Sequence, residues 1–407
     1  MLKNEWRQNW PTIFAGTIGL SLTTVYVYSM GAFLGPIQRD TGWTRSEISF
    51  GLTIATTCAA ILGPCVGAAI DRYGPRKLAI PGVVIYCVAI ALASTAHSLA
   101  GWWAIWTLIG ITSAGVKPTI WVSAVSSLFT RGRGLALAIT LSGAGLGSAL
   151  VPLASTVLIA SAGWRPAYAW LALLWGGVTF PLVLLLFRSA HDTRRSSLVA
   201  GSGGRLAGFN ARDALFSRQY LFILCASAVC ALVQMAFVIS LIPMLADAGI
   251  GSARAAMLAT IVGITSIAGR LISGHLVDRT NPLFVASASL AMPALSAALL
   301  LLAGPGSTVA STLAILVLGL SVGAELEAAT FLTARYFGLR SFGLLFSIIA
   351  SSATVATGVG PLLASYVHDQ TGSYRWMLIT AIPLSLMAGA MILSLGTPTR
   401  RATETSD

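Results

Sequence analysis

The segment GAAIDRYGPRKLAI, residues 67–80, lies between two long apolar runs. It contains four charged residues, Asp71, Arg72, Arg76 and Lys77. Such a concentration is unusual in this chain, because only 9% of its 407 residues are charged. The dipeptide Gly74-Pro75 in the centre of the segment predicts a tight turn. The segment therefore predicts a short polar loop that joins two apolar helices.

The apolar runs on either side belong to a repeating pattern. Hydrophobic residues make up 56% of the chain, and the mean hydropathy is +0.82. A soluble protein cannot cover that much apolar side chain, because its surface needs charge. Each run is about 20 residues long, which matches one crossing of a bilayer by a helix, and the short alternating segments of a β-barrel are absent. The sequence predicts an all-α polytopic membrane protein with 12 transmembrane helices, at 12–34, 46–69, 78–97, 102–128, 135–160, 167–188, 219–245, 253–276, 282–303, 308–334, 342–366 and 375–396.

The second half of the chain repeats the first. GAAIDR at Gly67 returns as GHLVDR at Gly274, 207 residues later. Three further matches follow in the same order at offsets of 208, 209 and 210 residues. The predicted domains are a six-helix half at 1–188, a Gly/Ser/Arg-rich cytoplasmic linker at 189–218 and a second six-helix half at 219–407. Parallel repeats of this kind are typical of transporters whose substrate site lies between the halves.

Lysine and arginine counts predict the orientation. With the N-terminus inside, 18 of the 25 basic residues lie on the cytoplasmic side, five lie outside and two lie within spans. Basic residues favour the cytoplasmic side, so we expect both termini in the cytoplasm of a cell with a bacterial-type inner membrane. The basic residues lie in loops and form no stripe, so we expect contact with membrane lipid and no nucleic acid partner.

Motifs of enzymes are absent from the sequence. It has no nucleotide-binding P-loop, no Ser-His-Asp arrangement and no metal-ligand spacing. Its five cysteines all lie in apolar runs, as small packing residues do. We therefore expect no catalytic residues, no metal and no cofactor, and a monomer that is not an enzyme.

Three motifs resemble the major facilitator superfamily across essentially the whole chain. GAAIDRYGPRK is similar to the family's signature loop between spans two and three, GHLVDR to its degenerate copy between spans eight and nine, and GAGLGSALVP to the glycine-proline motif of span five. The resemblance implies a secondary active transporter that works by alternating access.

Within that family, GAFLGPIQRDTGWTRSEISF resembles the monocarboxylate porter and oxalate:formate antiporter branch. The spacing of Arg270, Gly274 and Asp278 also matches that branch. Ser266 stands where animal monocarboxylate transporters carry an aspartate, and their span-one lysine and the span-eleven lysine of oxalate-type members are missing. The resemblance implies transport of a small organic anion, a monocarboxylate, by proton symport or exchange for a counter-anion. The alternatives are an efflux pump for drugs or amphipaths, and a non-transporting membrane sensor on the same fold.

The opening loop predicts a cytoplasmic gate. A carboxylate at Asp71 suits the positive N-terminal end of a neighbouring helix and pairs well with loop arginines. Gly67 is expected to let helices approach closely. The alternative is that the basic residues only set topology and touch anionic lipid. The predicted gating residues are Asp71, Arg72, Arg76, Arg131, Arg133 and Asp278.

Four ionisable residues fall inside predicted spans and away from the span ends, namely Lys117, Arg270, Glu325 and Glu327. Such residues are costly in a bilayer and usually face a cavity with a function. Arg270 lies about 12 Å along the helix from Asp278, and its planar fork suits a substrate carboxylate. The alternative for Arg270 is a structural ion pair with Glu325 or Glu327.

Lys117 and Glu325 occupy equivalent positions in the two halves, 208 residues apart. They would face one another across the pseudo-twofold axis if both pointed inward. Two interpretations stay open: a permanent ion pair between the halves, or an anion-binding Lys117 beside a proton-carrying Glu325. Tyr26, Tyr28 and Trp121 lie near these charges along the chain and are expected to stack on an organic substrate, the alternative being that they only pack.

Overall fold

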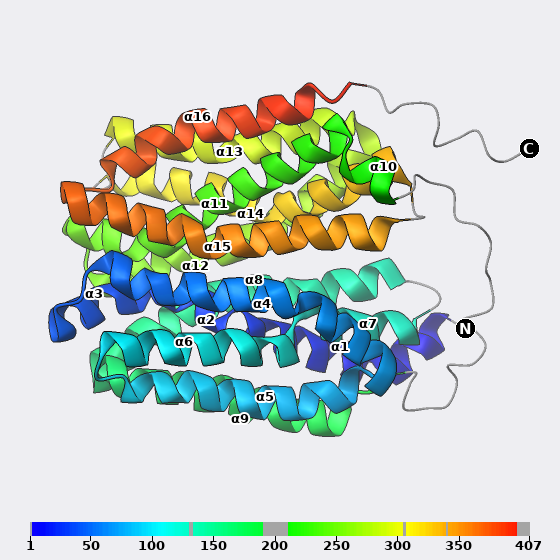
Figure 1. Ribbon diagram of the computed structural model, residues 1–407, viewed down its shortest axis with the longest axis horizontal. Coiled ribbons are helices and arrows are strands. Elements are labelled where there is room, and N and C mark those ends of the chain that lie inside the picture. Colours follow the sequence, from blue (N-terminus) through cyan, green and yellow to red (C-terminus); the bar gives the residue numbers. More distant parts are fainter. Residues whose placement is uncertain (1, 130–132, 190–210, 304–306, 339–340, 397–407) are drawn as a thin grey trace, which may run out of the picture. The chain divides into compact units, whose positions relative to one another are not determined.

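The computed structural model describes residues 2–129, 133–189, 211–303, 307–338 and 341–396, which are almost entirely helical. Within these ranges, 12 helical segments are long and apolar enough to cross a membrane, which confirms the predicted fold class. The helices group into two compact units, Met1–Gly201 and Ser202–Asp407. Each unit is a bundle of long helices (Figure 1).

The first unit contains nine α-helices and two 3₁₀ turns among its described residues. In chain order they are α1 (Leu2–Thr23), α2 (Val25–Tyr28), α3 (Met30–Thr41), α4 (Arg45–Tyr73), α5 (Pro75–Leu92), η1 (Ala93–Thr95), α6 (Leu99–Ser113), η2 (Ala114–Val116), α7 (Pro118–Leu128), α8 (Arg133–Ala162) and α9 (Trp164–Leu186). The first predicted span is therefore divided into α1, α2 and α3, and the fourth into α6, η2 and α7.

The second unit contains seven helices in its described part. They are α10 (Ala211–Leu215), α11 (Arg218–Asp247), α12 (Ser252–Arg279), α13 (Pro282–Ala303), α14 (Thr308–Phe337), α15 (Phe342–Thr371) and α16 (Arg375–Leu393). The segment predicted as a linker thus contains the short helix α10, while its residues 190–210 lie outside the described ranges.

The two units repeat the same packing partners. In the first unit the most extensive contacts join α4 to α6, α5 to α9 and α1 to α8. In the second they join α12 to α14, α13 to α16 and α11 to α15. Equivalent helices are therefore partners in both units, as a duplicated sequence requires.

The turn predicted at Gly74-Pro75 is present and is very short. Gly74, with φ 82° and ψ 152°, is the C-terminal cap of α4 and the N-terminal cap of α5. Pro75 is the first residue of α5. The positive φ favours glycine, while proline is well suited to the first helical position because its missing N–H is not needed there. Two residues are thus enough to reverse the chain between two spans.

Glycines allow the close helix crossings within each unit. A Cβ at Gly110 on α6 would come within 3.0 Å of the Ala55 backbone on α4, and one at Gly319 on α14 would come as near to the Val262 carbonyl on α12. These crossings occupy equivalent places in the two units. At Gly67, by contrast, a Cβ would meet no described atom within 4 Å. Gly67 thus makes no close helix contact with the described residues of its own unit, and a close approach at Gly67 stays a prediction.

Candidate substrate and proton site

Lys117 lies at a break in the fourth span. It separates η2 from α7 and adopts φ −54° and ψ 150°, an extended conformation. Its ammonium donates a hydrogen bond to the carbonyl of Ala59 on α4, and a Cβ at Gly63 would lie 3.0 Å from the ammonium nitrogen. The half-buried cation is thus held against the backbone of α4.

The predicted span at 102–128 is present as a candidate span at Leu99–Leu128, and two local features account for the break inside it. Pro118 disfavours the helical conformation for the residue before it and suits the first position of α7. Gly115 lies so close to Gly82 on α5 that a Cβ at either residue would come within 3.0 Å of the other's backbone. The sequence signal was the Lys117-Pro118 dipeptide, which the apolar run concealed.

Arg270 forms an ion pair within the second unit. Its Nε atom lies 3.3 Å from Oε1 of Glu327, which is on α14. The two side chains are 18% and 34% exposed, so the pair is partly shielded from solvent. Of the interpretations left open by the sequence, the ion pair with Glu327 is the one present in this conformation, and substrate binding by Arg270 stays a prediction.

The Arg270–Glu327 pair depends on an unusually close crossing of α12 and α14. A Cβ at Gly323, one turn before Glu327, would come within 3.0 Å of both the Ser266 carbonyl and the Arg270 amide nitrogen. Glycine at position 323 therefore brings the two backbones close enough for the side chains beyond it to meet.

Glu325 lies near a group of polar side chains that hydropathy did not reveal. It is half-buried and close enough to Cys230 on α11 to interact with it electrostatically. Gln234, one turn further along α11, is fully buried and donates from Nε2 to Oγ of Ser321 at 2.9 Å. Ser321 lies one turn before Glu325 on α14. Sequence reasoning missed Gln234 because a single uncharged amide does not interrupt an apolar run.

The three predicted aromatic residues have different environments. Tyr26 is half-buried and its ring meets that of Tyr86 edge-on at 6.3 Å, and Tyr28 is also half-buried. Trp121 is fully buried, and its indole N–H donates to the Val116 carbonyl at 2.8 Å. Its full burial leaves no surface for a substrate here, so we assign Trp121 to packing across the break in span four.

The predicted gating residues are only partly described. The guanidinium of Arg76 donates from NH2 to the Leu184 carbonyl at 2.9 Å, which ties the start of α5 to the end of α9. Arg72 lies over the ring of Tyr73, 5.3 Å from its centroid. The side chains of Asp71, Arg131, Arg133 and Asp278 lie outside the described set, so the gate stays a prediction.

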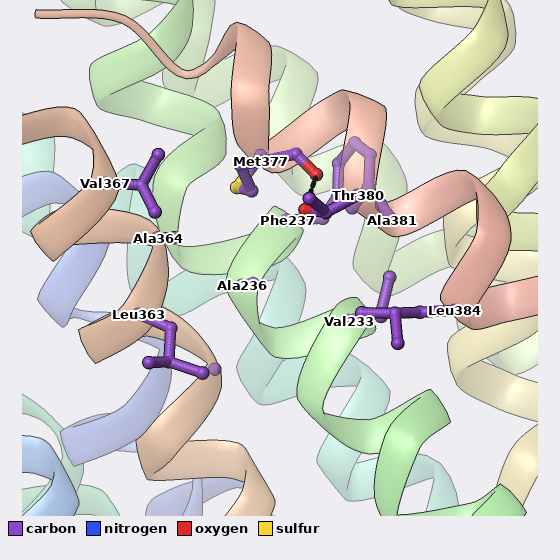
Figure 2. A pocket seen from close by; sticks show the side chains of 11 residues that line it. Val233, Ala236, Phe237, Leu363, Ala364, Val367, Met377, Thr380, Ala381 and Leu384 are labelled. Carbon is purple, nitrogen blue, oxygen red and sulfur yellow. Dashed lines mark hydrogen bonds between the residues drawn. The ribbon is translucent and has the colours of Figure 1, made fainter. Parts of the chain in front are cut away.

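A pocket in the second unit has an apolar lining. Figure 2 shows side chains from α11, α15 and α16 around it, among them Val233, Phe237, Leu363 and Met377. Its lining contains no charged side chain, so it does not suit an anion. Among the described residues, no group of three or more His, Cys, Asp or Glu side chains is placed to hold a metal ion.

Comparisons with known proteins agree with the fold. The model of the Major Facilitator Superfamily matches residues 14–330 and 223–407. The gallate transporter of Pseudomonas putida is 26% identical over 386 residues, covering 82% of this chain and 83% of that protein. Human monocarboxylate transporter 6 is 27% identical over 171 residues, covering 42% of this chain and 33% of that protein.

A solved structure supports the same assignment at the level of the fold. The bacterial homologue of the human lysosomal transporter Spinster, in its inward-facing occupied conformation, superposes with a TM-score of 0.71 at 15% identity, covering 94% of this chain and 96% of that one. The duplicated six-span pattern, the matched family model and this shared fold agree, and the chain belongs to the Major Facilitator Superfamily.

Proposed function

We propose that this transporter carries a small organic anion, a monocarboxylate, across a cell membrane by alternating access, with proton symport or anion exchange. The observation that carries the proposal is the partly buried Arg270–Glu327 pair inside the spans. The planar guanidinium of Arg270 suits a carboxylate, and a substrate carboxylate can take the place of the Glu327 carboxylate. The similarity to transporters of gallate and of monocarboxylates supports this substrate class.

In the proposed mechanism the substrate carboxylate competes with Glu327 for Arg270. The exchange of one carboxylate for another keeps the guanidinium paired, which avoids the cost of a buried unpaired charge. Lys117 supplies a second cation, since its ammonium has three donors and donates one hydrogen bond to Ala59. Tyr26 and Tyr28 are the proposed aromatic contacts for an organic substrate.

Glu325 is the proposed proton carrier. It lies two residues from Glu327 on α14, about 200° around the helix, so the two carboxylates point in different directions. One is paired with Arg270, while the other lies near neutral polar groups of α11. This separation gives the two carboxylates different tasks, one in anion binding and the other in proton binding.

The experiment is a thermal-shift screen of purified protein, followed by transport in proteoliposomes. Gallate, benzoate and short aliphatic monocarboxylates are compared with their uncharged amides. A ligand of the folded state raises its stability, so the proposal predicts higher melting temperatures with carboxylates and little change with amides. Counterflow of the best ligand then separates transport from sensing. Stabilisation by cationic amphipaths alone would contradict the proposal and favour the efflux alternative.

A further inference from the structure

Gln234 presents a buried acceptor for which the described structure shows no partner. Its side chain is 0% exposed, and its Oε1 atom lacks a hydrogen bond within the described residues. A buried polar atom without a partner is costly. Such an atom in a membrane-spanning helix calls for a donor that arrives in another state of the protein.

The orientation of the Gln234 amide follows from its neighbours. The hydroxyl of Ser321 donates its one hydrogen to the Ser289 carbonyl on α13, at 2.6 Å. It can therefore only accept from Gln234, whose NH₂ group lies 2.9 Å away. The NH₂ group also lies 3.1 Å from the sulfur of Cys230. The NH₂ is thus fixed toward Ser321 and Cys230, and Oε1 is the atom left over.

Helical spacing places Glu325 one turn from the serine that holds this amide. Ser321 and Glu325 are four residues apart on α14, so they share one face of that helix. Cys230 and Gln234 are four residues apart on α11 and also share a face, and α11 packs against α14. Glu325 interacts electrostatically with Cys230, which touches the amide of Gln234. The carboxyl therefore lies within electrostatic range of the sulfur that the amide touches, on the face of α14 that carries Ser321.

We propose that Gln234 completes a proton site with Glu325, its Oε1 accepting a hydrogen bond from the protonated carboxyl group. The inference rests on the proposed role of Glu325 as proton carrier. An ionised carboxylate has no hydrogen to donate, so the bond exists only in the protonated state. Gln234 thus stabilises the proton-loaded form and acts as a positioning residue.

Few other titratable groups face this site. On α11 the neighbour is Cys230, and α13 has no titratable residue between Pro282 and Ala303. On α12 the charge at this level is Arg270, which is paired with Glu327. Within the second unit, the groups that can set the proton affinity of Glu325 are therefore chiefly neutral hydrogen-bonding groups, and Lys117 of the first unit is the cation that the sequence leaves open.

The test is infrared difference spectroscopy of the purified, reconstituted protein across a pH titration. The carboxyl band lost in Glu325→Gln belongs to protonated Glu325. Gln234→Met keeps an unbranched side chain but removes the acceptor. We expect it to move the band to higher frequency, as a weaker hydrogen bond does, and to lower the pH of half-protonation by about one unit, a tenfold loss of proton affinity. Gln219→Met, on the same helix, is the matched control and should change neither value.

Other variants keep the test decisive. Ser321→Ala releases the amide from its fixed orientation and should shift the band in the same direction by a smaller amount, which supplies a readout if Gln234→Met folds poorly. An unchanged band and titration in both variants would overturn the role of Gln234 while leaving Glu325 as the carrier. If Glu325→Gln removes no titrating band and retains pH-driven uptake, the proposed proton carrier itself is wrong.

Discussion

The Arg270–Glu327 ion pair is both a structural contact and the centre of the proposed anion site. The pair is close enough for direct attraction, with 3.3 Å between Nε and Oε1, and is only partly exposed. Removing one partner leaves the other uncompensated in a poorly solvated place. The effect of each substitution therefore depends on whether a substrate carboxylate is present to replace the missing partner.

Substitution of Glu327 should strengthen anion binding. Glu327→Gln removes the carboxylate that competes with the substrate, so we expect about tenfold tighter binding, or about 1.4 kcal/mol, with a lower melting temperature in the absence of substrate. Arg270→Lys keeps the charge but loses the planar fork, and most transport should be lost. Isothermal titration with the best ligand of the carboxylate screen measures the affinity of Glu327→Gln, and counterflow in proteoliposomes measures transport by Arg270→Lys. Equal affinities in wild type and Glu327→Gln would show that the two carboxylates do not compete.

Substitution of Lys117 should separate packing from anion binding. Lys117→Met removes the hydrogen bond to Ala59, and a hydrogen bond from a charged group is worth about 1.5–3 kcal/mol, so we expect a loss of stability near that size. The same variant should no longer gain stability from carboxylates. Thermal unfolding with and without ligand measures both effects, and Lys77→Met, at an exposed position, is the control. Carboxylates that stabilise Lys117→Met as much as wild type would contradict a role in binding.

At the level of the helices, glycines set the spacing between the helices that carry the charged residues. The α12–α14 crossing places Gly323 directly against Ser266 and Arg270. The α5–η2 contact between Gly82 and Gly115 likewise adjoins the break at Lys117. In the second unit the close crossing lets Arg270 reach Glu327 on the neighbouring helix. In the first unit the glycine contact is with α5, while Lys117 reaches the Ala59 carbonyl on α4.

A matched pair of glycine substitutions tests this dependence. Gly323→Ala forces α12 and α14 apart, so we expect destabilisation of about 2 kcal/mol or more from overpacking and weaker anion binding because Arg270 moves. Gly274→Ala, where a Cβ would meet no described atom within 4 Å, should be close to neutral for stability. Melting temperatures and ligand affinities of the two variants are compared. A neutral Gly323→Ala would show that the crossing tolerates a methyl group.

In the whole molecule, the proposed coupling of a proton to an anion draws on one charged residue from each unit. Lys117 belongs to the first unit and Glu325 to the second, at equivalent positions of the repeat. Their local structures differ, because the helix is interrupted at Lys117, whereas α14 continues through Glu325. The two copies of the repeat thus differ at this position, with a cation in the first unit and a carboxylate in the second. Whether the two form an ion pair stays a prediction.

Single and double variants distinguish the two open interpretations. If Glu325 carries the proton, Glu325→Gln should retain substrate exchange, which moves no net proton, and lose pH-driven uptake. Lys117→Ala with Glu325→Gln should then transport nothing. If the two residues only neutralise each other, Glu325→Gln loses both activities and the double variant recovers them. Exchange and uptake are measured in the same vesicles.

The orientation in the membrane is a separate prediction of the whole chain. The basic residues of the loops favour cytoplasmic termini. A reporter that works only in the cytoplasm should be active when fused to either end of the chain, and a reporter that works only outside the cytoplasm should be inactive at both ends. Arginines added to the loop at residues 97–99 should weaken that preference, since this loop has no lysine or arginine in the native sequence. An unaltered topology after such additions would point to another determinant.

The spans, the repeat and the turn at Gly74-Pro75 could be predicted from the sequence, because they depend on local composition and residue order. Apolar runs of bilayer length predicted the spans, the 207-residue offset predicted the repeat, and Gly74-Pro75 predicted the turn between α4 and α5. These features follow from hydropathy and backbone preference, which neighbouring residues settle among themselves. The same reasoning did not reveal the break inside the fourth span, because the effect of Pro118 was hidden by an otherwise continuous apolar run.

The partners of the buried polar side chains could be read only from the tertiary structure. Glu327 rather than Glu325 pairs with Arg270, because the α12–α14 crossing at Gly323 sets which turn of one helix meets the other. Gln234 joins Ser321 for the same kind of reason, since α11 and α14 bring two distant turns together. A partner's identity depends on the height and rotation at which two helices cross, and that depends on packing along their whole length.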